Sequence, residues 1–318
     1  DLTDFNLELL RYLAWYNLER PHFSLTEPVP GRKTPRLLSA VQFLHQHHQC
    51  NMYWPDTPME PVWKTHLAAD TPFDPQYHQN PRVEIASFIN EPPGVVLDIG
   101  CGGGATGRLV KEKFPATRVI GVELNPHAAE YARQFLDDVI CGSIDDVDLA
   151  QHVGRVTIGT VLLLDVLEHL YDPWRALMKI RTWLAPGTRV LASVPNIRNL
   201  SSLDELAAGR WEYGPHGVLD ITHVRFFTRT TLRRLFEETG YAVVQMEALT
   251  QPAWVDRHVV ARGPGRLVTR NVSVAFRSRE DLEDLYAFQY VVDARAGDAV
   301  AAGGNPALPP RGEVSPIG

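Results

Sequence analysis

The chain has few cysteines and no long apolar run. Its 318 residues include only Cys50, Cys101 and Cys141, and no two of these stand at C-x-x-C spacing. An odd number without that spacing predicts neither a disulfide framework nor a cysteine zinc site, and it favours a reducing, cytoplasmic setting. The longest apolar stretch, residues 156–164, is too short to span a bilayer, so we expect no membrane segment.

The features of an exported or nucleic-acid-binding protein are also lacking. No charged segment followed by an apolar one opens the chain, and its first residue is Asp rather than Met, so we expect it to begin at a fragment boundary. Lys and Arg number 31 against 38 Asp and Glu, a net charge of -7. Because nucleic-acid-binding proteins usually carry a basic surface, we expect no nucleic-acid partner. The composition carries no signal for an oligomeric state.

The chain does contain enough apolar residues, 44%, to build a core. Its length suits one large domain, or one domain with a smaller attachment. Apolar residues at helical spacing predict a helix over residues 1–16, with Asp1 as a possible N-cap. A proline-rich loop should follow, and then a short apolar helix near residues 37–45. Residues 58–93 contain many prolines and should form a linker, with a helix near 83–89 that leads into the next domain.

Residues 94–295 alternate short apolar runs with helical patterns. The expected strands are residues 95–99, 118–123, 158–164, 189–194, 241–247 and 286–294, and the expected helices are near 106–113, 127–135, 173–184 and 229–239. This alternation predicts an α/β fold with a doubly wound, mostly parallel sheet covered on both faces. Residues 195–228 interrupt the pattern and should cover the site as a lid. Residues 296–318, rich in Gly, Ala and Pro, should form a disordered tail.

A buried strand runs into a glycine-rich turn and a helix at VVLDIGCGGGATG, residues 95–107. Glycines at this place let the backbone turn tightly and approach a ligand without a Cβ in the way. The spacing Gly100-x-Gly102-x-x-Ala105 also fits a dinucleotide fingerprint. The turn alone therefore leaves an NAD(P)-dependent oxidoreductase and an enzyme with another nucleoside cofactor equally open.

Acidic residues follow successive strands. Asp98 stands beside the glycine turn, where a carboxylate would repel a pyrophosphate and attract an ammonium or sulfonium group. Glu123 ends the next strand, where a carboxylate can accept hydrogen bonds from ribose hydroxyls. Asp145 is placed to receive an adenine amino group, with Ile144 packed on the ring, and Asp165 follows strand 158–164. Together they favour a cationic, ribose-bearing ligand, although carboxylates at these places can also cap helices or lie at solvated strand ends.

The segments VVLDIGCGGGATG, GVELNP, CGSID and LLLDVLEHLYDPWRAL together resemble the class I S-adenosylmethionine-dependent methyltransferases. With SVPNIRN and GRWEYGPHGVLDITHVRFFTRTTLRRLFEETGY, the similarity extends over about residues 80–295 to the ubiquinone-biosynthesis-like branch often found near glycan-assembly genes. One departure is Ala185-Pro186-Gly187-Thr188, where the family usually has Pro-Gly-Gly. A nucleotide-sugar oxidoreductase stays the alternative, although the sequence contains no recognisable Tyr-x-x-x-Lys.

The resemblance implies S-adenosyl-L-methionine as cofactor and methylation of a hydroxyl on a small-molecule or glycan acceptor. It also implies a seven-stranded sheet whose last strand, residues 286–294, is antiparallel. The cofactor-binding residues that it implies are Asp98, Gly100, Gly102, Gly104, Glu123, Leu124, Ile144, Asp145 and Asp165.

Residues 1–57 resemble a different family. FNLELLRYLAWYNLERPHFSL and CNMYWPDT are similar to the carboxyl end of integrase-type transposases. The stretches that would carry the three metal-binding carboxylates of such enzymes are missing, and residues 1–60 contain five Lys and Arg against seven Asp and Glu. We therefore expect a remnant without a catalytic or DNA-binding role, and a transposase-derived DNA-binding module is the alternative.

Methyl transfer requires the nucleophile, methyl and sulfur to be aligned and water to be excluded, and a hydroxyl acceptor benefits from a base. We expect His223, in the lid segment, to be this base and Asp165 to help place the acceptor. His169 is the second candidate base, or else a capping or packed histidine. Arg225 is placed to pair with an anionic substrate. Trp211, Tyr213 and His216 form either a substrate wall or lid core.

A metal-assisted mechanism is an alternative to this base. Asp165-x-x-Glu168-His169 with the later His223 resembles the pattern of metal-assisted O-methyltransferases that act on catechols or RNA ribose, although those typically have Glu where Asp165 stands. Mixed oxygen and nitrogen donors suit Mg²⁺ or Mn²⁺. Because short acidic-histidine strings after a strand are common, we expect no metal.

Overall fold

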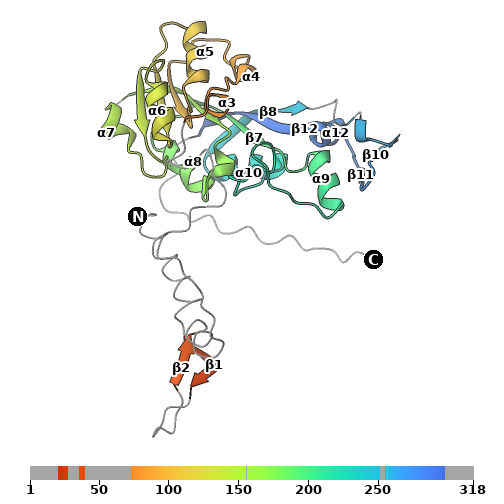
Figure 1. Cartoon of the computed structure of the whole chain (residues 1–318). Coiled ribbons are helices and arrows are strands. Elements are labelled where there is room, and N and C mark those ends of the chain that lie inside the picture. The colour runs from red at the N-terminus through yellow and green to blue at the C-terminus, as the bar shows by residue number, and fades with distance from the viewer. Residues whose placement is uncertain are drawn as a thin grey trace. The chain divides into compact units, whose positions relative to one another are not determined.

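The computed structural model describes residues 73–154, 156–250, 255 and 257–297, together with two strands near the N-terminus (Figure 1). The chain divides into two compact units, residues 1–62 and 63–318. In the first unit β1 (Pro21–Glu27) pairs antiparallel with β2 (Arg36–Ser39).

These two strands correct the predictions for this region. The segment expected as a proline-rich loop begins with strand β1. Residues 37–39, where a helix was expected to begin, belong to strand β2. The ladder satisfies backbone groups that an isolated short helix would leave open, and Pro28 and Pro30 fall between the strands, where no ladder N–H is required. The helix expected over residues 1–16 lies outside the described residues.

The second unit is built on a seven-stranded sheet with the order β5-β4-β3-β6-β7-β12-β8. The strands are β3 (Val95–Ile99), β4 (Val119–Glu123), β5 (Asp138–Cys141), β6 (Ile158–Leu164), β7 (Arg189–Pro195), β8 (Tyr241–Thr250) and β12 (Ala287–Ala296). β12 runs antiparallel to both of its neighbours, and the ladders among β3–β7 are parallel. The predicted doubly wound fold is thereby confirmed.

Helices cover both faces of this sheet (Figure 1). They are α3 (Pro75–His78), α4 (Val83–Ala86), α5 (Ala105–Lys113), α6 (Pro126–Ala132), α7 (Leu149–Val153), α8 (Pro173–Arg181) and α10 (Arg229–Glu238). Side chains alternate between the faces of a strand, so Leu97 and Ile99 pack in one apolar cluster, which includes α8 and α10, while Val96 packs in the other, which includes α4 and α5.

Local capping fixes where several helices begin. Asn125 precedes α6, and its side chain accepts hydrogen bonds from the backbone N–H groups of His127 and Ala128, with Pro126 at the first helical position. Thr228 and Thr231 cap α10 reciprocally. The helix expected near residues 83–89 ends at Ala86. None of the helices among the described residues is long and apolar enough to cross a membrane.

The strand order creates a crevice at the edge of the sheet. The chain leaves β3 toward β4 and β5 on one side, and it returns to build β6 and β7 on the other side of β3. The connections that follow β3 and β6 therefore diverge, and ligands of such sheets bind where this reversal occurs, at the carboxyl ends of the strands.

Two excursions extend from the sheet. The expected lid, residues 195–228, contains α9 (Leu200–Ala207). A second excursion between β8 and β12, which the sequence did not predict, contains β9 (Ala261–Gly263), β10 (Arg266–Val268), β11 (Ser273–Ala275) and α12 (Arg279–Tyr286). The three strands form an antiparallel sheet. A third apolar cluster of Leu200, Val255, Leu267 and Leu285 joins α9 to this excursion. We call the assembly of β9–β11, α9 and α12 the platform.

Candidate functional site

A cavity of about 910 Å³ lies at the carboxyl ends of β3, β4 and β6. Seven of the predicted cofactor-binding residues line it: Asp98, Gly100, Gly102, Glu123, Leu124, Ile144 and Asp165. Gly104 and Asp145 are not among the lining residues. All three predicted catalytic residues, His223, Asp165 and His169, line the same cavity, so the fold brings the two predicted groups together.

The glycine turn needs glycine for two separate reasons. Gly100 and Gly102 have φ angles of 71° and 53°, which favour glycine, and a Cβ on Gly102 would lie 2.7 Å from the backbone oxygen of His78. Gly104, with φ 81°, is the N-cap of α5, and a Cβ there would press on Ala132 and Leu136. Gly104 thus serves helix packing, whereas Gly100 and Gly102 shape the cavity wall.

Two buried carboxylates face the glycine turn. Asp98 is only 2% exposed, and its Oδ2 has no hydrogen-bond partner. Burial, followed by the charge of Glu123, raises the pKa of Asp98 to about 7. Glu123 accepts hydrogen bonds from the N–H of Gly102 on Oε2 and from the N–H of Asn125 on Oε1, both at 2.8 Å. A buried carboxylate that lacks a partner fits a cationic ligand, so this wall suits a sulfonium or ammonium group.

The predicted adenine contacts lie on the loop after β5. Ile144 is buried in the cavity wall, and Asp145 is half-buried beside it. Burial, and then the neighbouring Asp146, raise the pKa of Asp145. Lys179 of α8 donates hydrogen bonds to the backbone carbonyls of Ile144, at 3.0 Å, and Asp145, at 2.6 Å. Lys179 therefore holds the loop, and the contact of Asp145 with adenine stays a prediction.

Asp165 is held by three partners. It has a φ angle of 55°, a sparsely populated conformation for a residue other than glycine. Its Oδ1 accepts hydrogen bonds from the Ser193 hydroxyl, at 2.8 Å, and from the Gln289 side-chain amide, and its Oδ2 forms an ion pair with Arg82. Arg82 was not predicted as a site residue, because nothing in the sequence of a proline-rich linker indicates that the linker folds back over the sheet. Arg82 is the single Arg or Lys among the described residues that line this cavity.

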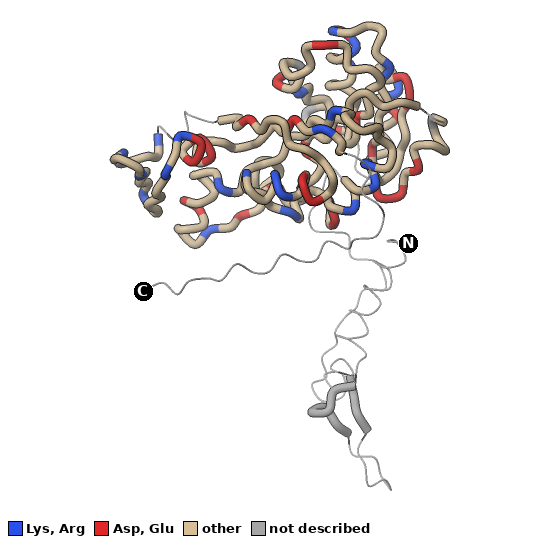
Figure 2. Tube along the Cα trace, turned by 180° about the vertical axis from the view of Figure 1, so that it is seen from behind, with Lys and Arg blue, Asp and Glu red and all other residues tan. Residues whose placement is uncertain are grey.

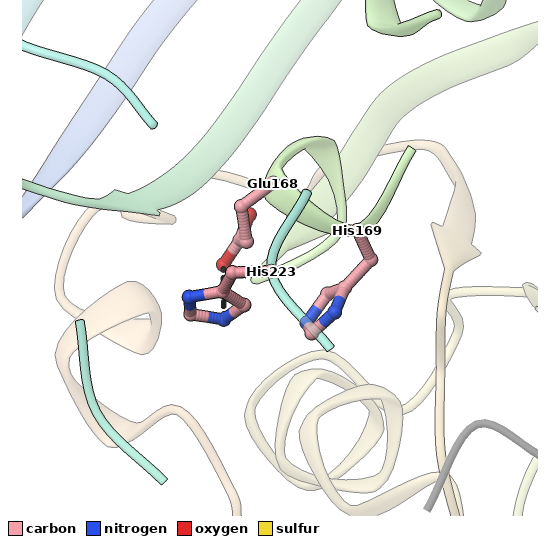
Figure 3. A group of neighbouring side chains, drawn as sticks. All are labelled: Glu168, His169 and His223. Atoms are coloured by element: carbon pink, nitrogen blue, oxygen red, sulfur yellow. Dashed lines mark ion pairs between the residues drawn. The ribbon is translucent and has the colours of Figure 1, made fainter. Parts of the chain in front are cut away.

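Glu168, His169 and His223 gather at the end of β6 (Figure 3). The first two lie on a short 3₁₀ helix, Leu167–His169, and His223 comes from the lid. Glu168 is 1% exposed, and neither of its carboxylate oxygens has a hydrogen-bond partner. His223 Nε2 lies 3.9 Å from Glu168 Oε1, and the two imidazole centroids are 4.8 Å apart. Burial raises the pKa of Glu168 to about 8.

Hydrogen bonds define the tautomers of both histidines. His223 Nδ1 lies 3.0 Å from the carbonyl of Val218, so this nitrogen donates and Nε2 keeps a lone pair. The Thr222 hydroxyl donates to Asp220, so it accepts from His169 Nδ1, 2.9 Å away, and His169 Nε2 also keeps a lone pair. Burial lowers the pKa of His169 to about 4, and burial also lowers that of His223. Both imidazoles are therefore neutral at pH 7, in the form that serves as a base or a metal ligand.

Three other residues that the sequence singled out do not line the cavity. Arg225 donates to the carbonyls of Tyr171 and Val224 and does not line the cavity, so the anionic-substrate interpretation has no support there. Trp211 packs edge-on against Phe226, also away from the lining. Tyr213 is exposed and does not line the cavity either.

Of the three residues expected as a substrate wall or as lid core, only His216 lines the cavity, where its ring stacks with that of Tyr77 at 6.4 Å between centroids. Tyr77 precedes the segment whose sequence resembles methyltransferases, and it was not predicted as a site residue. Burial raises its pKa.

Comparison with known proteins agrees with this geometry. A family model described as a methyltransferase domain matches residues 76–246. Ubiquinone biosynthesis O-methyltransferase of Aeromonas salmonicida is 26% identical over 159 residues, covering 48% of this chain and 65% of that protein. An uncharacterized 37.1 kDa protein in transposon TN4556 of Streptomyces fradiae is 30% identical over 159 residues, covering 48% of this chain and 45% of that protein.

The matched region thus spans about half to two thirds of the length of these curated relatives. Among solved structures, a SAM-dependent methyltransferase from Archaeoglobus fulgidus aligns with a TM-score of 0.48 and 19% identity, over 67% of this chain and 91% of that chain. The family match covers more than half of the present sequence, including the glycine turn, Glu123, Asp165 and His223. The chain belongs to the methyltransferase domain family, with the class I fold and S-adenosyl-L-methionine as its cofactor.

Proposed function

We propose that the protein transfers a methyl group from S-adenosyl-L-methionine to a hydroxyl of a small-molecule or glycan acceptor. The observation that carries this proposal is the neutral His223, whose Nε2 lone pair lies in the same cavity as the buried carboxylates Asp98 and Glu123. A base near the acceptor favours hydroxyl methylation, because a hydroxyl is a poor nucleophile until its proton leaves.

The residues present fit the cofactor. The unpartnered oxygen of Asp98 and the buried Glu123 suit its cationic and ribose-bearing parts, and Ile144 offers an apolar wall for adenine. Arg82 is the group available for the carboxylate of the methionine portion, because the other charged side chains of the described lining are acids or histidines. Bound there, S-adenosyl-L-methionine supplies an electrophilic methyl group.

Asp165 acts through Arg82 in this proposal rather than on the acceptor. Both of its oxygens already have partners, and the ion pair with Arg82 fixes the guanidinium at the cavity wall. His223 Nε2 then accepts the acceptor's hydroxyl proton, and the buried position of the imidazole keeps it neutral before the reaction. His169, whose Nε2 also keeps its lone pair, is the second candidate for the base.

The charge of the side chains that line the cavity limits which acceptors can bind there. Seven acids line it: Asp74, Asp98, Glu123, Asp165, Glu168, Glu205 and Asp220. The one arginine, Arg82, already pairs with Asp165. An acceptor with a carboxylate or phosphate near its reacting hydroxyl would meet net repulsion, so we propose a neutral or cationic acceptor group.

A second way to activate the acceptor is favoured by one observation. Glu168 is buried without a hydrogen-bond partner on either oxygen, and its ligand atoms lie within 4.8 Å of those of His169 and His223. An unpaired buried carboxylate is costly, and a divalent cation would satisfy it. A cation held by these three residues would lower the pKa of an acceptor hydroxyl, so that a weak base or water could take up its proton.

One experiment separates these mechanisms. Purified protein is incubated with methyl-labelled S-adenosylmethionine and a panel of catechols, amines and glycan fractions, with and without chelator. If His223 is the base, His223→Ala lowers turnover about 10²–10⁴-fold, chelator has no effect, and cofactor affinity by calorimetry is unchanged. If a cation is used, chelator abolishes turnover, Mg²⁺ or Mn²⁺ restores it, and Glu168→Ala is as damaging as His223→Ala. Calorimetric binding of NADH in place of S-adenosylmethionine would reject the proposed function itself.

A further inference from the structure

The platform carries a run of positive charge in an acidic protein. Residues 257–279 contain six arginines and one histidine and no Asp or Glu, whereas the whole chain has a net charge of -7. Figure 2 shows Lys and Arg gathered at the end of the molecule that carries β9–β11, on the left of that view. Arg266, Arg270 and Arg277 are exposed. This segment lies outside the cavity and has no part in the proposed methyl transfer.

Three of these arginines, Arg266, Arg270 and Arg277, form no ion pair with the described residues. Arg266 donates to the hydroxyl of Ser273, at 3.1 Å, and no carboxylate among the described residues lies within ion-pair distance of Arg266, Arg270 or Arg277. The acids of the adjacent α12 are paired elsewhere: Asp281 with Arg198 at 2.5 Å, Asp284 with Arg229 at 2.6 Å and Glu283 with Arg279 at 3.0 Å. Asp281 also accepts a hydrogen bond from the backbone N–H of Arg277, at 2.9 Å, so the charges of Arg266 and Arg270 are the ones without a nearby carboxylate among the described residues.

The shape of the small sheet suits a flat partner. Leu267 is buried on one face of β10, so Arg266 and Val268 lie on the other face. In the ladder Arg266 is opposite Gly263 and Ala275, and Val268 is opposite Ala261 and Ser273. Small side chains thus surround Arg266, and nothing bulky would hold a flat surface away from it. Val260, just before β9, is an apolar side chain that is 70% exposed.

The platform is firmly attached to the mouth of the cavity. Buried Asp204 of α9 accepts hydrogen bonds from the Thr269 hydroxyl and from the backbone and side-chain N–H groups of Asn271, both in the turn between β10 and β11. Other residues of the same helix, Ser201, Ser202 and Glu205, line the cavity. A partner on the platform would therefore be held at a defined position relative to the cavity.

We infer that the arginine-rich end of the platform docks on an anionic lipid bilayer, with the exposed Arg266, Arg270 and Arg277 against headgroup phosphates. Three exposed guanidinium groups without a carboxylate ion-pair partner match a surface of phosphates, and the exposed Val260 of the same excursion is disfavoured in water and favoured at an interface. Docking would place the cavity mouth near acceptors that sit at the membrane surface.

A nucleic acid matches this face less well. The one Phe, Tyr or Trp in 257–279, Phe276, is partly buried in the platform core, so the His258 imidazole is the one exposed ring that the described residues of this segment offer for base stacking. The small sheet face also presents no protruding helix or ribbon for a duplex groove.

Vesicle flotation tests the docking. The full chain is mixed with vesicles of phosphatidylcholine alone or of phosphatidylcholine with phosphatidylglycerol. We expect binding to the second kind only, weakening with salt. In Arg266→Gln/Arg270→Gln/Arg277→Gln the affinity should fall roughly hundredfold, because each cation near such a surface contributes about 1 kcal/mol. The matched control replaces Arg108, Arg233 and Arg234 by Gln, which changes the charge equally on helices α5 and α10.

Three results would overturn the inference: no flotation with anionic vesicles, equal loss in the control variant, or binding of duplex or single-stranded DNA in place of vesicles. Calorimetry with S-adenosylmethionine verifies that each variant is folded. If the triple variant does not bind the cofactor, the single variants Arg266→Gln and Arg270→Gln make the same test, with a loss of about fivefold each. Flotation does not depend on methyl transfer, so its outcome is independent of the proposed function.

Discussion

Replacing Asp98 by Asn should change how cofactor binding depends on pH. The carboxyl is 2% exposed, one of its oxygens has no partner, and burial raises its pKa to about 7 in the ligand-free protein. A cationic ligand favours the ionised form, so S-adenosylmethionine should bind more tightly as pH rises through this value. The ionised fraction increases from roughly one tenth at about pH 6 to roughly nine tenths at about pH 8, so affinity should rise about tenfold.

Ionisation of Asp98 also affects the stability of the fold, and here a rise in pH is unfavourable. Because the folded-state pKa lies above the unfolded value of 3.8, the folded protein binds the proton more tightly, and the free energy of unfolding falls as pH rises from about 4 to about 7. A shift of this size corresponds to at most about 4 kcal/mol. In Asp98→Asn this fall should be absent, so the variant should gain stability relative to the wild type above pH 7.

Isothermal calorimetry at several pH values measures the first effect, and thermal unfolding without ligand measures the second. Asp138→Asn is a matched control, because Asp138 lies on the edge strand β5 and pairs with Arg118 away from the cavity. A wild-type affinity that does not change between about pH 6 and 8, or a slope retained in Asp98→Asn, would refute the placement of a cationic group beside this carboxyl.

Two further predictions concern the fold and the N-terminal segment. Gly100→Ala should destabilise the protein by more than Gly187→Ala, since both positions have positive φ but a Cβ on Gly100 would lie 2.6 Å from Val166 Cγ2, while nothing lies within 4 Å at Gly187; equal melting temperatures would contradict this. Deletion of residues 1–57 should leave calorimetric S-adenosylmethionine affinity unchanged, and loss of binding on deletion would show that this segment is more than a remnant.

Much of the cofactor half of the site was predictable because it is local in sequence. A glycine turn between a buried strand and a helix has one common geometry, so VVLDIGCGGGATG placed Asp98, Gly100 and Gly102 at one sheet edge. Glu123 is the last residue of β4 and Asp165 directly follows β6, and parallel strands end at the same edge. The resemblance of these segments to a known family then identified the cofactor that the family match confirms.

The contacts that these residues make with one another were harder to predict from the sequence. Gly104 has a positive φ like Gly100 and Gly102, but it packs against Ala132 of α6 and against Leu136, and this difference depends on where those two residues lie. Asp165 was expected to help place the acceptor, which stays a prediction, and its partners in the structure, Ser193, Gln289 and Arg82, come from three separate parts of the chain. Partners so far apart in sequence leave no local pattern.

The amino-acid sequence by itself determined most strands and helices of the seven-stranded sheet and the carboxylates at the strand ends, since these follow from apolar periodicity and from turns that involve neighbouring residues. The cofactor class came from the resemblance of several such segments to a known family. Only the tertiary structure decided that Arg82 reaches the cavity, that Glu168 is buried without a partner between two neutral histidines, and that an arginine-rich sheet is fixed to α9. Those features depend on burial and on contacts between segments 50 or more residues apart, as for Thr222 with His169 at a separation of 53, and neither burial nor such contacts can be read from local spacing.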